Sequence, residues 1–255
     1  MVQAGMDDMW ISLDGVDLIH DRVRGRDGTF KRVEQSIEWL REARGTRPIP
    51  RLRANCTISK YNVESFDKLL DFAEEKGMDS VHLEYVGEFW QDTVDRSVVD
   101  GIKPTPYFIR EGSESSLVNE KEGRLVKEKI ARMKELARGM RVKLYTENVD
   151  KLTVENMAKG RFENKKCYII RFKVSVDPSG FVLGCPFFGD WRLGNIQEEP
   201  LEKIWRNEKH RRIMKAFKKG EMQLCRYCIL GVMRNPTFFQ DVRDVANAFL
   251  GRVRM

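Results

Sequence analysis

The sequence predicts an α/β protein in two parts: a parallel sheet with crossover helices over residues 1–148, and a small hairpin-and-helix domain over residues 149–255. Three observations lead to this prediction. Strand-like and helix-like segments alternate through the first part, an order typical of parallel strands joined by right-handed crossovers. After residue 150 the alternation gives way to a hairpin pattern and then a long helical pattern. Four of the five cysteines lie after residue 166.

In the first part, short apolar and β-branched runs alternate with segments whose apolar residues recur every three or four positions. Residues 87–115, with two prolines, are predicted to form a long irregular connection of the kind often built over a site. The predicted strands are 9–13, 51–58, 80–86 and 142–145; the predicted helices are 29–43, a segment from the cap residue Asn62 to Gly77, and a long helix through 126–137.

The segment 51–58 alternates strictly between apolar and polar residues. Leu52, Ala54, Cys56 and Ile58 share one face; Arg51, Arg53, Asn55 and Thr57 share the other. A parallel sheet is normally covered on both faces, and a buried guanidinium group needs a partner. A barrel lumen that holds an anionic or polar ligand would meet that need; an edge strand with solvated arginines is the alternative. Cys56, on the apolar face, is predicted to be core packing.

The cysteines of the second part form two pairs. Cys167 and Cys185 lie at the ends of two β-branched runs that meet at residues 177–180, a hairpin signal that would bring both cysteines together. Cys225 and Cys228 form a C-x-x-C pair, whose thiolates can bind one metal centre. Four soft ligands are therefore predicted to converge on one site. A helix from Pro200 to Gly220 precedes the C-x-x-C pair, and a closing helix is predicted over 238–253.

Composition narrows the class of protein. Charged residues make up 33% of the 255 residues and hydrophobic residues 41%, which is typical of a globular protein. No apolar run approaches the roughly 18 residues of a membrane span, and the acidic start lacks a hydrophobic signal core. These features predict a cytoplasmic protein, where paired cysteines are more often metal ligands or catalytic than disulfides. The net charge of +7 is interpreted as solvated helix faces rather than a nucleic-acid surface.

Several motifs along the chain together resemble one known family. In the first part they are Ile11-Ser-Leu-Asp-Gly15 with His20, Arg24-Gly25, Gly28 and Phe30, and then Arg53-Ala-Asn-Cys-Thr-Ile-Ser59 with Asn62. In the second part they are Cys167, Gly180-x4-Cys185, Gly194-Asn-Ile196, Leu201-x-x-Ile-Trp205 and Cys225-x-x-Cys228. The first set is similar to the fourth and fifth strands of the radical S-adenosylmethionine (SAM) barrel. The second set resembles the cysteine-rich SPASM/twitch extension that many radical SAM enzymes carry.

This resemblance implies a partial radical SAM barrel followed by a domain for an auxiliary 4Fe–4S cluster held by the four cysteines after residue 166. It implies that Ser12, Arg53 and Asn55 contact SAM; the alternatives are a turn cap for Ser12 and a strand tie for Asn55. It also implies a peptide or small metabolite as substrate and a reducing partner such as ferredoxin or flavodoxin. Asp190 is a candidate base in the substrate space, although a loop-capping role is favoured.

The sequence departs from the family pattern at two places. No cysteine follows Cys228, which favours the shorter twitch form with one fully ligated cluster and an electron-transfer role. The C-x-x-x-C-x-x-C loop that binds the SAM-cleaving cluster is also missing from the sequence. We therefore expect that this chain does not cleave SAM alone, and that it is a fragment of a longer enzyme. The alternatives to a fragment are a half-barrel completed by a second chain and an inactive scaffold.

A structural zinc module that binds a protein or nucleic acid is the competing hypothesis. Zinc readily takes four cysteines, and C-x-x-C is a common half-site. The other half here spans a predicted hairpin, which is unusual for a zinc ribbon. Colour separates the two hypotheses, because an iron–sulfur protein is brown and a zinc protein is colourless.

Overall fold

The computed structural model describes residues 2–106, 109–110, 115–162 and 167–233. The chain forms two compact units, and neither is continuous in sequence. Unit 1 comprises Met1–Gly87 and Glu114–Gly160, and unit 2 comprises Glu88–Ser113 and Arg161–Met255. The connection predicted over 87–115 thus contributes most of its residues to unit 2. The predicted functional division between 1–148 and 149–255 stays a prediction.

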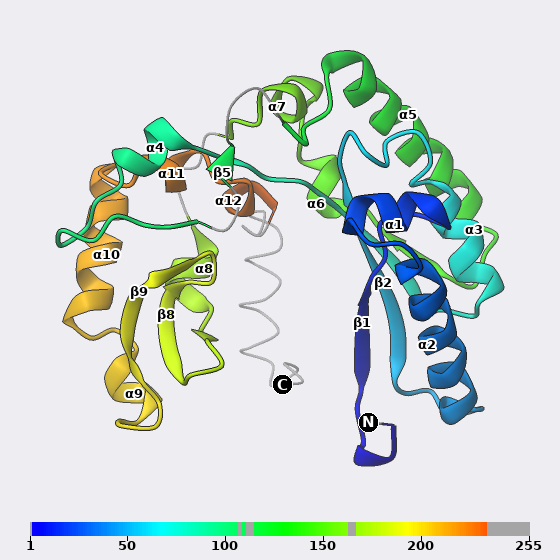
Figure 1. Ribbon diagram of the computed structural model, residues 1–255, viewed down its shortest axis with the longest axis horizontal. Helices are drawn as coiled ribbons and strands as arrows, with labels where there is room; N and C mark the ends of the chain where they lie inside the picture. Colours follow the sequence, from blue (N-terminus) through cyan, green and yellow to red (C-terminus); the bar gives the residue numbers. More distant parts are fainter. Residues whose placement is uncertain (1, 107–108, 111–114, 163–166, 234–255) are drawn as a thin grey trace, which may run out of the picture. The chain divides into compact units, whose positions relative to one another are not determined.

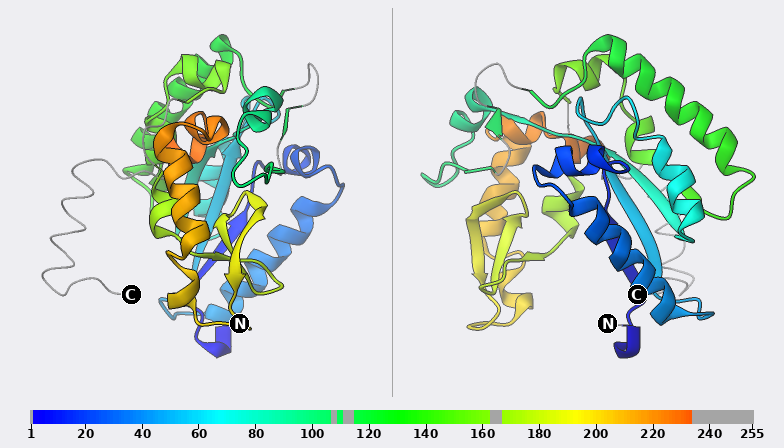
Figure 2. Two further views of the ribbon diagram at one scale, coloured as in Figure 1. Left: turned by 90° about the vertical axis from the view of Figure 1, so that its left-hand side faces the viewer. Right: turned by 45° about the vertical axis from the view of Figure 1, so that its right-hand side comes forward.

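Unit 1 contains a four-stranded sheet in which every neighbouring pair of strands is parallel, in the order β1-β2-β3-β6. Helices α2, α3 and α5 lie along one face of this sheet (Figures 1 and 2). The strands are β1 Asp8–Ser12, β2 Arg51–Ile58, β3 Ser80–Tyr85 and β6 Lys143–Tyr145; the helices are η1 Val2–Ala4, α1 Leu18–Arg24, α2 Thr29–Arg44, α3 Lys68–Glu75, α5 Glu120–Ala137, α6 Glu147–Asp150 and α7 Val154–Lys159.

The alternation predicted for residues 51–58 is confirmed in β2. Its four apolar residues are fully buried, whereas the four polar residues between them are exposed or half-buried. Apolar residues of β3 continue the buried face, and the inward sides of α2, α3 and α5 cover it, including Phe30, Ile37, Leu69, Leu70, Val126, Ile130 and Met133. The predicted α/β fold class with a parallel sheet is therefore confirmed.

The helix predicted to start at Asn62 is wrong at its beginning. Residues 60–67 form irregular turns, and α3 begins at Lys68. The Asn62 side chain accepts a hydrogen bond from the Ser59 amide (2.8 Å) and donates to the Asp14 carbonyl (2.7 Å). An asparagine that is this deeply buried satisfies its polar atoms with backbone groups at the ends of β1 and β2, so a local capping signal misplaced the start of the helix.

Unit 2 is built on a three-stranded antiparallel sheet, β7-β8-β9. Gly180, at φ +86°, closes the turn between β7 and β8, where the Asp177 carboxylate accepts hydrogen bonds from the Ser179 and Phe181 amides (2.9 and 3.0 Å). The strands are β4 Phe89–Trp90, β5 Ile109–Arg110, β7 Ser175–Val176, β8 Phe181–Cys185 and β9 Phe188–Asn195; the helices are α4 Gln91–Asp95, α8 Tyr168–Phe172, α9 Leu201–Ile204, α10 Glu208–Lys219, α11 Gln223–Arg226 and α12 Ile229–Met233.

The structure corrects two predicted elements of this unit. The hairpin turn at 177–180 is confirmed, but half of the predicted first arm is helix α8 rather than strand. The helix predicted from Pro200 to Gly220 is two helices, because Arg206 adopts φ +68° and Asn207 caps a new helix by accepting from the His210 amide (3.0 Å). The closing helix predicted over 238–253 lies outside the described residues.

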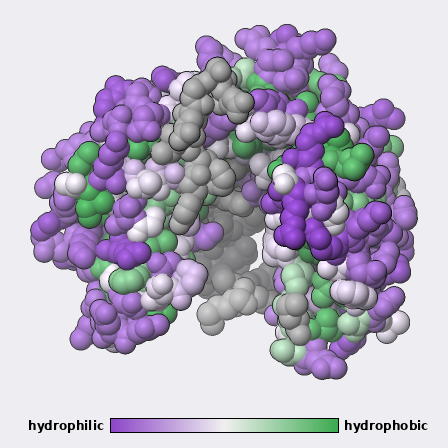
Figure 3. Space-filling view, viewed as in Figure 1, coloured by the Kyte–Doolittle hydropathy of each residue, from purple (hydrophilic) through white to green (hydrophobic). Residues whose placement is uncertain are grey.

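Hydrophilic residues dominate the visible face of each unit, with smaller hydrophobic patches among them (Figure 3). None of the helices in the described ranges is long and apolar enough to cross a membrane.

Candidate functional site

Four cysteines come together on the hydrophobic core of unit 2. Cys167 directly precedes α8, Cys185 ends β8, and Cys225 and Cys228 lie in and just after α11. Cys225 is a member of the buried core and the other three pack against it. The surrounding side chains are apolar or aromatic, among them Phe89, Val94, Phe188, Trp191, Ile213 and Leu224.

The electrostatics of these thiols show how closely they are grouped. Burial raises the pKa of all four, to about 12 for Cys228. In every pair among the four, one thiol also raises the pKa of the other by charge repulsion. Thiolates in such a place need a compensating cation, because an isolated buried charge is strongly disfavoured. Cys56 is a separate case in unit 1, where burial raises its pKa and it packs in the sheet core.

Buried polar groups hold the segments that carry these cysteines. The Ser97 hydroxyl, fully buried beyond α4, accepts a hydrogen bond from the Leu224 amide (2.9 Å), one residue before Cys225. The His210 Nδ1 accepts from the Arg206 amide (3.1 Å), so its Nε2–H donates to the Ile170 carbonyl (2.7 Å) of α8. Neither positioning residue was predicted from the sequence. The only signal for His210 was its place three residues after a capping asparagine.

The structure explains why two positions of the motifs in unit 2 are glycine. A side chain at Gly180 would meet the Asn195 Oδ1 at 2.6 Å, and one at Gly194 would meet Ile204 at 3.1 Å. The Asn195 side chain donates to the Ser179 carbonyl (3.1 Å) and accepts from the Gln197 amide (2.9 Å). These residues lie at the end of the β8–β9 pair opposite Cys185.

The donor set fits an iron–sulfur cluster: four thiols from three separate segments, one buried and three half-buried, grouped on an apolar core. Within the described parts of the chain, no three Cys, His, Asp or Glu side chains are arranged around a single ion position. The assignment of the four cysteines as ligands therefore rests on their chemistry and grouping.

Asp190 lies on β9, and its carboxylate is already engaged. It accepts hydrogen bonds from the Thr105 amide (2.7 Å) and the Thr105 hydroxyl (3.4 Å). Both contacts hold the loop after α4, which is the capping role favoured from the sequence. A shallow pocket that includes Asp190 and Arg192 lies beside this loop.

In unit 1, the three predicted SAM contacts lie on the polar face of the sheet. Ser12, at the carboxyl end of β1, pairs in register with Asn55 of β2. Arg53 is two residues earlier on the same face, and its Nε donates to the Asp8 carboxylate (2.5 Å). The structure thus brings Ser12 and Asn55 together and places Arg53 closer to the amino end of the strand.

The motif after β1 builds the carboxyl edge of this sheet. The buried Asp14 accepts from the Thr57 amide (2.9 Å) and pairs with Arg24 (2.7 Å), while its own amide donates to His20 Nδ1 (3.2 Å). Asp21 accepts from the Gly28 and Phe30 amides (2.6 and 2.7 Å), which fixes the start of α2. These contacts give the motif residues a positioning role behind Ser12.

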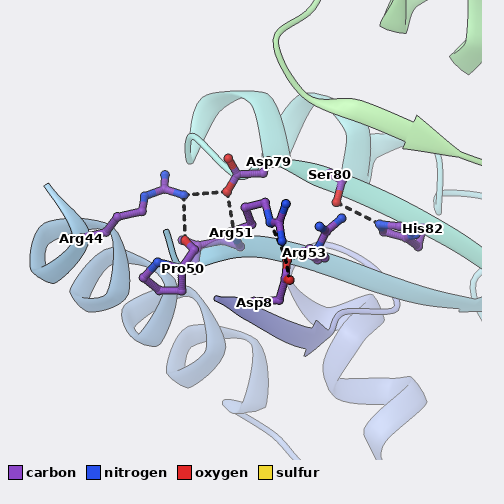
Figure 4. Close-up of polar contacts among 9 residues, drawn as sticks. Asp8, Arg44, Pro50, Arg51, Arg53, Asp79, Ser80 and His82 are labelled. Atoms are coloured by element: carbon purple, nitrogen blue, oxygen red, sulfur yellow. Dashed lines mark hydrogen bonds and ion pairs between the residues drawn. The ribbon is translucent and has the colours of Figure 1, made fainter. Parts of the chain in front are cut away.

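A row of aromatic side chains, which was not predicted from the sequence, crosses the polar face. Trp10 of β1 contacts His82 of β3 (ring centroids 4.5 Å apart), and His82 stacks on Tyr145 of β6 (4.3 Å, planes 7° apart). The Arg53 guanidinium lies 5.5 Å from the Trp10 ring centroid, and Ser80 Oγ hydrogen-bonds His82 Nε2 (2.9 Å; Figure 4). The alternation of residues along β1 and β3, which places Trp10 and His82 on the polar face, could have predicted this row.

The comparisons with known proteins agree with this geometry. Residues 167–229 match the SPASM family, described as an iron–sulfur cluster-binding domain. The chain is 27% identical over 233 residues to the AdoMet-dependent heme synthase of Methanosarcina barkeri (strain Fusaro / DSM 804). The matched segment covers 88% of this chain and 61% of that protein. The chain therefore spans less than two thirds of this relative's length.

Two solved structures share the fold. Native anSMEcpe with bound AdoMet matches with a TM-score of 0.55 and 18% identity, over 87% of this chain and 58% of that one. Streptococcus suis SuiB matches with a TM-score of 0.51 and 13% identity, over 92% and 51% of the two chains. The predicted resemblance is thereby confirmed: residues 167–229 match an iron–sulfur cluster-binding domain of the SPASM type, and the chain is similar to radical SAM proteins that carry such a domain.

Proposed function

We propose that unit 2 holds one auxiliary 4Fe–4S cluster, bound by Cys167, Cys185, Cys225 and Cys228, in a radical SAM enzyme that oxidises or otherwise modifies a peptide or small metabolite. The observation that carries this proposal is the mutual grouping of the four thiols in one apolar core. When bound, such a cluster supplies one-electron chemistry. Full ligation by four cysteines favours the twitch form and a role in electron transfer.

The residues of the chain have distinct parts in this function. The four thiolates would bind the cluster, while Ser97 and His210 hold the segments that present Cys225 and Cys167. The aromatic side chains around the site exclude water, and cluster potentials respond to such exclusion. Asp190 remains a candidate base, although its contacts with Thr105 support the loop-capping role.

The polar sheet face of unit 1 would provide part of the SAM site. Ser12 and Asn55 present a hydroxyl and an amide at neighbouring register positions, which suit the ribose and amino-acid ends of SAM. Arg53, on the same face, supplies a guanidinium group for a carboxylate. The bound AdoMet of the anSMEcpe structures supports this placement by the shared fold.

We further propose that the cysteine loop for SAM cleavage comes from sequence outside these 255 residues, in a longer chain or in a second one. The relative and the solved structures extend well beyond the matched segment, which supports this proposal. A low-potential electron donor, such as ferredoxin or flavodoxin, would reduce the complete enzyme. A reducing cytoplasm suits cysteines that bind a cluster rather than form disulfides.

The similar proteins support two substrate classes. One anSMEcpe structure of the same fold contains the Cp18Cys peptide together with AdoMet, which supports a peptide substrate. The sequence relative is named a heme synthase, which supports a small metabolite. Both classes stay within the proposal.

Anaerobic reconstitution tests the cluster assignment. The chain should turn brown and bind about four irons and about four sulfides, and Cys225→Ala should lose or destabilise this cluster. Cys56→Ala is the matched control, since Cys56 is buried in the other unit and should leave the iron content unchanged.

Two outcomes would overturn the assignment. One is loss of iron in Cys56→Ala while Cys225→Ala keeps it. The other is a purified chain with one tightly bound zinc that never accepts iron, which would establish the zinc module instead.

A further inference from the structure

A cavity of about 370 Å³ lies at the amino-terminal end of the sheet in unit 1, at the opposite end of the strands from Ser12. It is lined by the first residues of β2, β3 and β6 and by the segments that lead into β3 and β6. The lining residues are Arg51, Arg53, Glu74, Gly77, Met78, Asp79, Ser80, Arg141, Lys143 and Tyr145.

The two acidic residues of the lining are already engaged. The Asp79 carboxylate accepts from Arg44 Nη1 (2.6 Å), which reaches it from α2, and from the Leu52 amide (2.7 Å; Figure 4). The Glu74 carboxylate accepts from the Arg141 and Val142 amides (3.1 and 2.9 Å), and these hydrogen bonds help to lower its pKa. Both acids therefore position the strand ends rather than compete for a ligand.

Two basic residues of the lining, Arg53 and Lys143, have hydrogen-bond donors without an acceptor among the described residues. A single carboxylate, Asp8, is shared by Arg51 (2.8 Å) and by the Nε of Arg53 (2.5 Å). The terminal nitrogens of Arg53 have no hydrogen-bond partner among the described residues, although its side chain is only 17% exposed. Lys143 likewise has no ion pair in the described part of the chain.

The charges around the cavity do not balance. Five cationic side chains, the four of the lining and Arg44, stand against four carboxylates, those of Asp7, Asp8, Glu74 and Asp79. An excess of positive charge within a concave, half-enclosed space favours anions. The guanidinium fork of Arg53 suits the paired oxygens of a carboxylate or phosphate.

We infer that this cavity binds a small anion whose charge is carried on carboxylate or phosphate groups. Arg53 and Lys143 would contact the anion from β2 and β6. Tyr145, in the stacked row with His82, forms the aromatic wall of the site. Arg53 is also a proposed SAM contact, whereas Lys143 belongs to this site alone; the other proposed SAM contacts, Ser12 and Asn55, lie toward the opposite end of the strands. The anion site does not depend on the cluster.

Calorimetric titration of the full chain with pyrophosphate and, separately, with citrate tests this inference at low ionic strength. Saturable binding of either anion is expected, weakened by about tenfold in Lys143→Gln and by more in Lys143→Glu, because a charge-assisted contact is lost and then reversed. Tighter binding of pyrophosphate would assign a phosphate ligand, and tighter binding of citrate a carboxylate ligand.

Lys31→Glu is the matched control, because it makes the same change in net charge at an exposed position of α2. Equal weakening by Lys143→Glu and Lys31→Glu, or no saturable binding of either anion to the unchanged chain, would overturn the inference. Iron content, measured on the same samples, should stay unchanged in Lys143→Glu. The iron measurement therefore distinguishes a failure of anion binding from a failure of cluster binding.

Discussion

The two units stabilise their interiors by different means. In unit 1 the buried polar groups satisfy one another: Asp14 is paired with Arg24, and Asp21 binds the amides that begin α2. In unit 2 the core contains four thiols whose neighbours are apolar or are other thiols. Unit 1 is therefore stabilised by packing and hydrogen bonds, whereas the four thiols of unit 2 would be stabilised by a bound cluster.

Leu69→Ala should have the largest effect, and this effect should be confined to the stability of unit 1. Leu69 is fully buried against the sheet, so its truncation should lower the free energy of unfolding of unit 1 by about 2–5 kcal/mol. Iron bound by unit 2 should be unchanged. Urea unfolding followed by hydrogen exchange measures the first quantity and iron analysis the second. Leu136→Ala, at an exposed position, should cost less than about 0.5 kcal/mol. Iron loss parallel to the loss of stability would contradict the comparison.

Ser97→Ala should produce an intermediate effect confined to unit 2. The variant leaves the buried Leu224 amide without its acceptor, at a cost of about 1–3 kcal/mol. We expect faster hydrogen exchange around Cys225 and faster iron loss to a chelator. Ser36→Ala removes an exposed hydroxyl from α2 and should change neither rate. Unaltered exchange in Ser97→Ala would show that this hydrogen bond does not hold the C-x-x-C segment.

The smallest effect concerns pH and unit 1. Hydrogen bonds from the Phe30 amide and then the Gly28 amide lower the pKa of Asp21 below its ordinary value of 3.8. A lowered folded-state pKa contributes stability above the unfolded-state pKa, and this stability is lost as pH falls through the folded-state value.

Asp21→Asn should therefore lower the urea midpoint of unit 1 at pH 7, and its deficit relative to the unchanged chain should shrink near pH 3. Asp27→Asn, at an exposed position nearby, should show no such pH dependence. A deficit that is equal at both pH values would mean that the charge of Asp21 contributes nothing to the fold.

Local patterns in the sequence determined several features correctly. The strict alternation of residues 51–58 fixed both the bounds and the buried face of β2, because successive strand residues point to opposite faces. The turn at 177–180 followed from its Asp-Pro-Ser-Gly sequence, in which glycine adopts a positive φ. The pairing of the cysteines in sequence was enough to propose four ligands, and their identity as ligands stays a prediction.

Other features were decided only by tertiary contacts. The β-branched residues around Ile170 predicted a strand, but they form α8, where Ile170 is buried and its carbonyl accepts from His210. Intrinsic preference is a weak guide for such short segments, because burial against distant residues outweighs it. The assignment of residues 88–113 to unit 2 has the same origin, since Ser97 binds a segment more than a hundred residues away.

The polar face of the sheet in unit 1 shows most clearly which features followed from the sequence and which from the tertiary structure. The sequence by itself placed Arg51, Arg53 and Asn55 on one face of a strand and required partners for them. Only the parallel register set Trp10, His82 and Tyr145 beside them and gathered Arg53 and Lys143 around one cavity. Alternation within a strand is a property of neighbouring residues, whereas register joins residues from strands far apart in the chain, and no local pattern specifies it.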